Sequence, residues 1–332
     1  MNRALLIVTL VTAFGIGCKK SEPAKSETGS STETTGTTKG SSMETKPPTA
    51  APGVAGEADP WSKPPAAKDP LPKPFLWSVE KDGKTSYLLG TIHQGVDAES
   101  RLPKIVFDKL DAAPAFAMET DLSSASDAMK EMIQCVGCSL KKELTPEEYK
   151  KLEDVLGKAT VEQVQGMKPM VAATMVSLSF MPQTAPMDGV LQGRAQRLKK
   201  RMIYLEKADD AAKVLAKWMD VRALKLMLQD VEGGKKQMTE MLASYIAGDD
   251  KKLLEINDEE KDRTLKIYTQ AEYDQQQIDM LYNRNAAWLP AIEAMHAAGG
   301  GFVAVGTLHL VGPKSVPDLL EKKGYKITRI TP

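Results

Sequence analysis

The sequence predicts an α/β (α+β) fold in which a central β-sheet is built from N- and C-terminal strands around a large helical middle. Strand-like apolar runs occur near the two ends of the folded part of the chain, at residues 75–80, 85–89, 301–305 and 325–330. Almost all of the sequence between them has helical patterning. Because strands must pair to satisfy their backbones, the two ends are expected to share one sheet.

The N-terminal part of the predicted domain reads as a hairpin followed by a helix and a strand. Asp82-Gly83 is a strong turn signal between the strands at 75–80 and 85–89. Residues 102–112 are expected to form a helix, which ends before Pro114. The apolar run 115–118 then forms a short strand that leads directly into Glu119.

The middle of the chain is predicted to be helical, with one strand-like run at 202–205. Thr145-Pro146-Glu147-Glu148 combines an N-cap, a proline at the first helical position and a capping-box glutamate. The expected helices are 145–156, 170–180, 190–200, 209–228, 235–247, 272–298 and, near the end, 316–322. The 17 methionines are interpreted as filling irregular space in helical cores.

The first residues are predicted to lie outside the folded domain. Met1-Asn2-Arg3, the apolar run to residue 16 and the small residues before Cys18 form a secretory signal over residues 1–17. Cys18 is the expected lipidation site, the alternative being an ordinary signal with a chance cysteine. Residues 18–73 are rich in Ser, Thr, Gly and Pro and are expected to be a disordered tether. The predicted domain is 74–332, on an exported lipoprotein anchored in the bacterial cell envelope by this lipid.

Composition excludes some classes of function. The chain has 44 basic and 44 acidic side chains and only 5% aromatic residues. Because nucleic-acid binding needs basic surplus and often aromatic stacking, no nucleic-acid partner is expected. The 3 cysteines are too few for a disulfide scaffold. Any histidine chemistry must come from His93, His296 or His309.

The CxxC sequence Cys135-Val136-Gly137-Cys138 has two interpretations. Such a pair can serve redox or zinc chemistry. In an exported chain with no second CxxC, we prefer a local disulfide between Cys135 and Cys138.

Two segments of the sequence resemble each other. Residues 87–93 and 303–309 are each an apolar strand followed by Gly-Thr-aliphatic-His. A glycine just past a strand permits a sharp turn or close approach. The histidine that follows can project over the carboxyl end of the strand, where open α/β sheets place their ligands.

Glu119 is expected to join these histidines, because it also follows an apolar strand. His93, Glu119 and His309 are donor types that could bind a divalent metal, which would activate water and polarise a carbonyl. The alternative carries equal weight: Glu119 caps a helix and the histidines are core residues. His296, near the end of the helix at 272–298, is expected to be structural.

The chain also resembles the TraB/GumN family, which includes the animal Tiki proteins. The residues that carry this resemblance are Gly90-Thr91-Ile92-His93, Glu119-Thr120-Asp121, Asp188, Leu205-Glu206, Arg284-Asn285 with Trp288, Gly306-Thr307-Leu308-His309 and Gly324-Tyr325. They occur in the family's order over nearly the whole predicted domain. The resemblance implies a TraB/Tiki/erythromycin-esterase-like fold and a metalloprotease-like activity with a divalent ion, manganese or cobalt.

The resemblance implies roles for individual residues. His93, Glu119 and His309 would be metal ligands, or the histidines an acid/base pair, with Glu119 as general base. Arg284 would stabilise an oxyanion or bind a substrate carboxylate, the alternative being an ion pair with Glu206 or Asp188. Glu206 would support the site or add a ligand.

Three functions remain open from the sequence. The first is a metal-dependent hydrolase, peptidase-like, acting on a peptide or small-molecule substrate. The second is a non-catalytic binding or regulatory lipoprotein that holds a peptide or ligand in the same cleft. The third is an esterase that uses His93 as general base without metal.

Overall fold

A six-stranded mixed sheet organises the domain, whose computed structural model describes residues 69–122, 133 and 135–332. The strand order is β4-β3-β5-β2-β1-β6. The strands are β1 (Leu76–Lys81), β2 (Lys84–Thr91), β3 (Ala115–Met118), β4 (Arg201–Tyr204), β5 (Phe302–Gly306) and β6 (Lys326–Arg329). Strands β4, β3, β5 and β2 are parallel, and β1 is antiparallel to both β2 and β6. The prediction that both ends of the domain share one sheet is confirmed.

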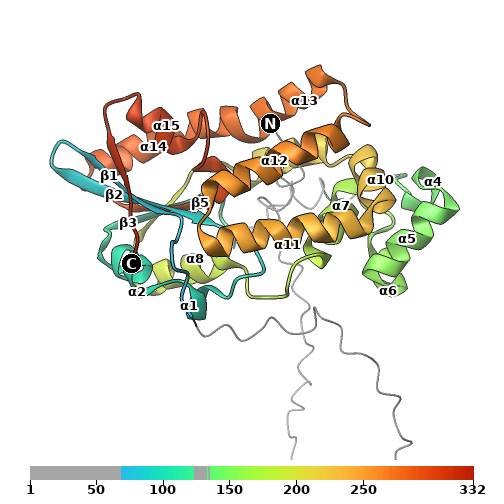
Figure 1. Cartoon of the computed structure of the whole chain (residues 1–332), viewed down its shortest axis with the longest axis horizontal. Coiled ribbons are helices and arrows are strands. Elements are labelled where there is room, and N and C mark those ends of the chain that lie inside the picture. The colour runs from blue at the N-terminus through green and yellow to red at the C-terminus, as the bar shows by residue number, and fades with distance from the viewer. Residues whose placement is uncertain (1–68, 123–132, 134) are drawn as a thin grey trace, which may run out of the picture. The chain divides into compact units, whose positions relative to one another are not determined.

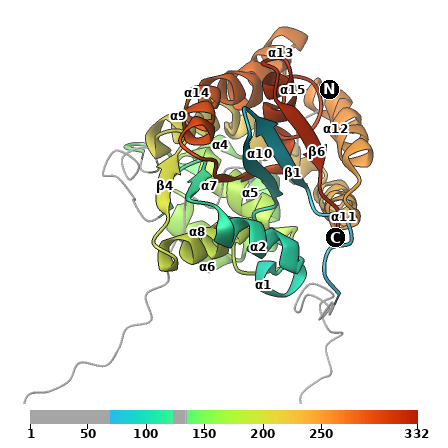
Figure 2. The same ribbon diagram turned by 90° about the vertical axis from the view of Figure 1, so that its left-hand side faces the viewer.

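Helices cover both faces of this sheet. In both views, α14 and α15 lie on one side of the strands and α2 and α8 on the other (Figure 1 and Figure 2). The helices that pack on or near the sheet are α1 (Ala98–Arg101), α2 (Lys104–Ala112), α8 (Met187–Arg197), α14 (Asn283–Ala297) and α15 (Val316–Glu321). The remaining helices are α4 (Leu140–Glu143), α5 (Pro146–Leu156), α6 (Lys158–Val164), α7 (Pro169–Ser179), α9 (Ala208–Trp218), α10 (Val221–Gln229), α11 (Val231–Ala247), α12 (Asp250–Thr264) and α13 (Gln270–Gln277).

Local signals placed several elements correctly. Asp82 and Gly83 have φ of 51° and 71° between the paired Lys81 and Lys84, which is the type I′ geometry that an Asp-Gly hairpin favours. The capping box of Thr145 and Glu148 is present at the start of α5. The strand predicted from 115–118 is β3 in full.

The core lies on both faces of the parallel strands. All residues of β3 and β5 are buried, as continuous apolar strands of a covered parallel sheet should be. Phe116 and Phe302 stack across the pair with ring centroids 6.2 Å apart. The two central strands β3 and β5 are therefore packed on both faces.

Two helices predicted as continuous are interrupted. The segment 209–228 divides at Asp220, whose side chain accepts from the backbone N–H groups of Arg222 and Ala223 and starts α10. The segment 272–298 contains the π-helical turn Ile278–Tyr282 between α13 and α14. Helix α12 has no counterpart in the predicted elements, because its sequence is charged on most sides.

The structure joins Cys135 and Cys138 by a disulfide, with Cα atoms 5.3 Å apart. Cys18 and the predicted signal and tether lie outside the described residues. Within the part of the chain that the structure describes, no helix is long and apolar enough to cross a membrane.

Candidate functional site

The predicted site residues gather at the carboxyl edge of the parallel strands. His93 follows β2, Glu119 follows β3, Glu206 follows β4 and His309 follows β5. Arg284 reaches them from α14. We refer to His93, Glu119, Glu206, Arg284 and His309 as the edge cluster. Carboxyl edges of parallel strands are the usual ligand sites of open α/β sheets.

The twin Gly-Thr-aliphatic-His segments lie side by side. Thr91 is paired with Gly306 in the sheet, and the Thr307 hydroxyl donates to the Thr91 carbonyl at 2.8 Å. A Cβ on Gly90 would lie 2.9 Å from the Thr307 Oγ1, so glycine is required there for close packing. Neither Gly90 nor Gly306 has a positive φ. Neither glycine is therefore needed for a left-handed backbone conformation, and Gly90 is needed for close packing.

His93 is oriented by Asp188 of α8. Nδ1 of His93 lies 2.5 Å from Oδ2 of Asp188, and the Thr91 hydroxyl donates to Oδ1 at 2.7 Å. Burial raises the pKa of Asp188, but His93 and Thr91 outweigh it and hold that pKa below its usual value. Asp188 is thus an ionised acceptor that fixes the imidazole, with Nδ1 as donor and Nε2 as its second polar atom.

Arg284 holds the two glutamates of the edge cluster. Its Nη2 donates to Oε2 of Glu119 at 2.7 Å and also to Oε1 of Glu206. Its Nε donates to Oε2 of Glu206 at 2.9 Å, and its Nη1 is 3.2 Å from both the Met280 carbonyl and Nε2 of His309. All three guanidinium nitrogens are engaged. Arg284 therefore forms the ion pair with Glu206, and Asp188 pairs with His93 instead. In this arrangement Arg284 has no N–H donor left to stabilise an oxyanion.

One turn of α14 surrounds His309. Besides Arg284, Asn285 accepts from Nδ1 of His309 at 2.6 Å, and its own amide group donates to the Lys314 carbonyl at 2.9 Å. The rings of Trp288 and His309 lie 4.4 Å apart between centroids. Because Arg284 can only donate, Nε2 of His309 is the acceptor and Nδ1 carries the proton.

Glu119 is the carboxylate with the most unusual environment. Its Oε1 accepts from the backbone N–H of Gly306 at 2.8 Å, in addition to the Arg284 contact at Oε2. Burial raises the pKa of Glu119, against the opposing effect of Arg284. The two catalytic carboxyl groups expected from the sequence thus share one counter-ion, with side chains 11% and 13% exposed for Glu119 and Glu206.

Comparison with known proteins assigns the chain to a family. A family model described as the TraB/PrgY/gumN family matches residues 75–329. The chain belongs to this family.

Two curated relatives extend the comparison. The protein named "Uncharacterized protein YbaP" of Shigella flexneri is 25% identical over 252 residues, covering 71% of this chain and 87% of that protein. The protein of the same name in Escherichia coli (strain K12) is 25% identical over 251 residues, covering 70% of this chain and 87% of that protein. No solved structure matches the chain.

The family motifs have physical explanations in the fold. Arg284, Asn285 and Trp288 all contact His309 from one helical turn. Asp188 positions His93. From sequence, Asn285 and Trp288 are residues of one motif, and Asp188 is a motif residue or an ion-pair partner for Arg284. Nothing in their local sequence indicates that Asn285 and Trp288 contact His309, or that Asp188 contacts His93.

The predicted metal ligands do not fit a metal ion in this arrangement. Among residues 69–122, 133 and 135–332, no group of three His, Cys, Asp or Glu side chains is placed to hold one. Arg284 explains this physically, because its cationic guanidinium already binds Oε2 of Glu119 and Nε2 of His309. A metal at His93, Glu119 and His309 would compete with Arg284 for the same lone pairs.

His296 is structural, in keeping with the expectation from sequence. Its Nδ1 lies 2.9 Å from the Ser86 hydroxyl and its Nε2 lies 3.1 Å from the Lys81 carbonyl. Its ring also packs edge-on against Tyr325. It ties the end of α14 to the β1–β2 hairpin.

We expect His309 to be neutral at neutral pH, with its proton on Nδ1, and to show no titration at the usual imidazole pKa. Burial and then the charge of Arg284 hold the pKa of His309 well below its usual value. Side-chain ¹⁵N NMR of histidine-labelled protein can check this, since the chain has 3 histidines. A His309 signal that titrates with a midpoint near 6.5 would contradict this geometry.

Proposed function

We propose that this chain is a hydrolase of the cell envelope that cleaves a peptide or related acyl bond at the edge cluster. The observation that carries the proposal is the Asp188–His93 pair beside a buried Glu119–Arg284–His309 network. Burying charged groups is costly unless they are paired, and replacing such networks by apolar residues often stabilises a protein. Their presence at a ligand-binding edge therefore supports a chemical role.

In the proposed reaction, His93 is the general base. Asp188 accepts from Nδ1 and stabilises the positive charge that forms when Nε2 takes a proton from water. The resulting hydroxide-like oxygen adds to the carbonyl carbon of the substrate. Positioned acid–base groups of this kind contribute about 10²–10⁴-fold to rates.

Glu119 is the proposed proton donor to the leaving group. In the resting site its carboxylate is paired with Arg284, and because burial raises its pKa it can take up the proton that His93 removes from water and pass it to the leaving group. Arg284 and Glu206 act as positioning residues, because Arg284 holds Glu119, Glu206 and His309 in one place. The bond to the leaving group breaks as the proton from Glu119 reaches it.

The metal-dependent form of this hydrolase remains a rival proposal, motivated by the family resemblance. The experiment uses purified full-length protein with panels of fluorogenic peptides and short-chain nitrophenyl esters. Each is assayed after chelation and again after added manganese or cobalt. Turnover that persists in chelator supports the metal-free mechanism. Turnover only with added metal would support the metal-dependent form and require Arg284 to release its ligands.

A non-catalytic binding protein is the outcome if no member of either panel is cleaved. The proposal of a hydrolase would then fail, and peptides from the same panel would be tested for binding. Affinity unaffected by Glu119→Gln would further separate binding from the proposed chemistry.

We also propose that Cys18 anchors the chain to the envelope membrane through lipid. Several acyl chains on one cysteine would bind firmly, since each buried CH₂ contributes about 0.8 kcal/mol. We expect the native chain in the membrane fraction and a Cys18→Ser chain in the soluble envelope fraction. Fractionation and immunoblotting check this, and retention of Cys18→Ser in membranes would contradict it.

A further inference from the structure

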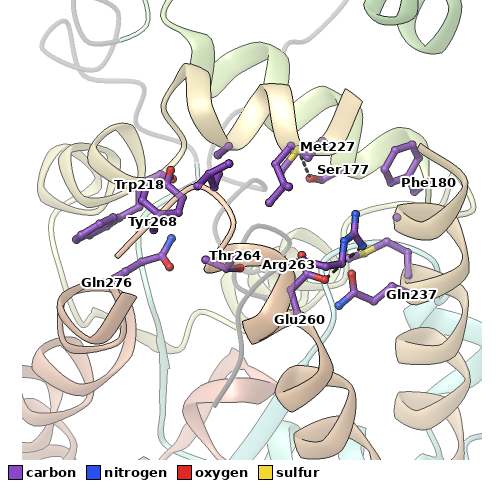
Figure 3. A pocket seen from close by; sticks show the side chains of 15 residues that line it. Ser177, Phe180, Trp218, Met227, Gln237, Glu260, Arg263, Thr264, Tyr268 and Gln276 are labelled. Carbon is purple, nitrogen blue, oxygen red and sulfur yellow. Dashed lines mark hydrogen bonds and ion pairs between the residues drawn. The ribbon is translucent and has the colours of Figure 1, made fainter. Parts of the chain in front are cut away.

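A cavity outside the edge cluster lies among the helices α7, α9, α10, α11, α12 and α13. It holds about 50 Å³, several times the roughly 10–15 Å³ that one water needs. In Figure 3, apolar side chains line one side of the cavity, including Trp218, Met227 and Phe180. Polar side chains, including Gln276 and Glu260, line the opposite side. The lining is thus suited to a molecule with one apolar and one polar face.

One polar group in this lining has no partner in the protein. Gln276 is 8% exposed, and its Oε1 is buried without a hydrogen bond. Burying an unsatisfied acceptor costs about 1–3 kcal/mol, so buried polar groups are nearly always paired. An unpaired acceptor beside open space is satisfied by water or by the donor group of a ligand that displaces the water.

The charged group on the same side is already satisfied. Oε2 of Glu260 accepts from Nη1 of Arg263 at 3.3 Å. Arg263 also forms an ion pair with Asp230, with Nη2 of Arg263 3.4 Å from Oδ2 of Asp230. The charges of Glu260 and Arg263 are therefore paired within the protein. The neutral acceptor Oε1 of Gln276 remains as the polar contact for a ligand.

We propose that this cavity binds a small, largely apolar molecule that carries one hydrogen-bond donor. The apolar part packs against Trp218 and Met227, and its N–H or O–H group donates to Oε1 of Gln276. This site takes no residue from the edge cluster, so it stands or falls independently of the hydrolase proposal.

Phenol and toluene are matched probes for this site, because they share a ring and differ by a hydroxyl group in place of a methyl group. The ring is larger than 50 Å³, but the cavity is partly open to solvent, so part of the ring can remain outside it. Each is titrated into full-length protein while the ε-methyl NMR signals of Met227 and Met238, both in the cavity lining, are followed. We expect saturable shifts, with phenol bound about fivefold more tightly than toluene, as one added neutral hydrogen bond gives.

Three variants test the assignment. Gln276→Met removes the acceptor at similar size, and phenol should then bind no more tightly than toluene. Gln270→Met makes the same change at an exposed position of α13 and should leave the phenol preference intact. Ala223→Met adds apolar volume to the cavity lining and should abolish the shifts.

Two results would overturn the proposal. One is the absence of saturable shifts at Met227 and Met238 with either probe. The other is an unchanged phenol preference in Gln276→Met. If Gln276→Met does not fold, equal affinities of the unaltered protein for phenol and toluene would still reject the role of Gln276.

Discussion

The Arg284→Met variant is expected to lose about 3–5 kcal/mol of unfolding free energy, because it leaves the buried Glu119 carboxylate and the partly buried Glu206 carboxylate without their counter-ion. Arg284 is 6% exposed and contacts both Glu119 and Glu206. Its cation also lies over the Trp288 ring, 4.9 Å from the centroid. Equilibrium denaturation at neutral pH measures the loss.

A control variant can distinguish the effect of the unpaired carboxylates from the effect of lost packing. The triple variant Glu119→Gln/Glu206→Gln/Arg284→Met removes the stranded charges and should recover most of the stability. A loss of less than about 1 kcal/mol in Arg284→Met alone is within the range of an exposed ion pair. It would show that the ion pairs of Arg284 are not desolvated. A triple variant no more stable than Arg284→Met would point to packing instead.

The same variant should respond to pH in a defined direction. Burial raises the pKa of Glu119 in the folded state above its value in the unfolded state. The contribution of this group to the free energy of unfolding is therefore fully present below the unfolded-state pKa, and it is lost as the pH rises through the folded-state pKa. Removing Arg284 takes away the opposing effect. We therefore expect the deficit of Arg284→Met relative to the native chain to be larger at pH 8 than at pH 5.

The second large effect is expected at Asp188. Asp188→Asn should lower kcat/KM for the best substrate of the panels by about 10²–10⁴-fold, because an amide does not stabilise a positively charged imidazole or fix its tautomer. The loss should fall mainly on kcat, since Asp188 acts through His93. Steady-state kinetics on each variant give the values.

Asp111→Asn is the matched control for this experiment. Asp111 also accepts from a basic side chain, Arg194 of α8, but its side chain is 35% exposed. Its replacement should leave kcat/KM within about twofold, because surface ion pairs contribute little. Equal losses in both variants, or no loss in Asp188→Asn, would remove Asp188 from the mechanism.

The edge of the sheet was predictable because its signals are local. The twin Gly-Thr-aliphatic-His segments and Glu119 each follow an apolar run, and parallel strands bring their ends to one edge. The position of Arg284 was not predictable in the same way, since it depends on how α14 packs against the sheet. The sequence therefore indicated the donors for a metal, while the folded arrangement places a guanidinium among them.

The fold shows the same division between local and tertiary information. The Thr145 capping box and the Asp82-Gly83 turn fix their elements through contacts within a few residues. The π-helical turn Ile278–Tyr282 has no comparable signal. It places the Met280 carbonyl against Arg284, and Asp279 accepts from Trp218 of α9 at 2.9 Å. Such an irregular turn is specified by the partners on both sides of the helix, which only the folded chain brings together.

The most direct test compares two buried histidines in one assay. His93→Gln and His296→Gln each remove a buried imidazole, but only His93 belongs to the edge cluster. The rate of full-length protein on the best substrate of the panels is measured in the presence of chelator. We expect His93→Gln to lower the rate by at least about 10²-fold, and the folded His296→Gln protein to retain most of it. A His93→Gln protein that cleaves the substrate as fast as His296→Gln would contradict the assignment of the edge cluster as the reaction centre.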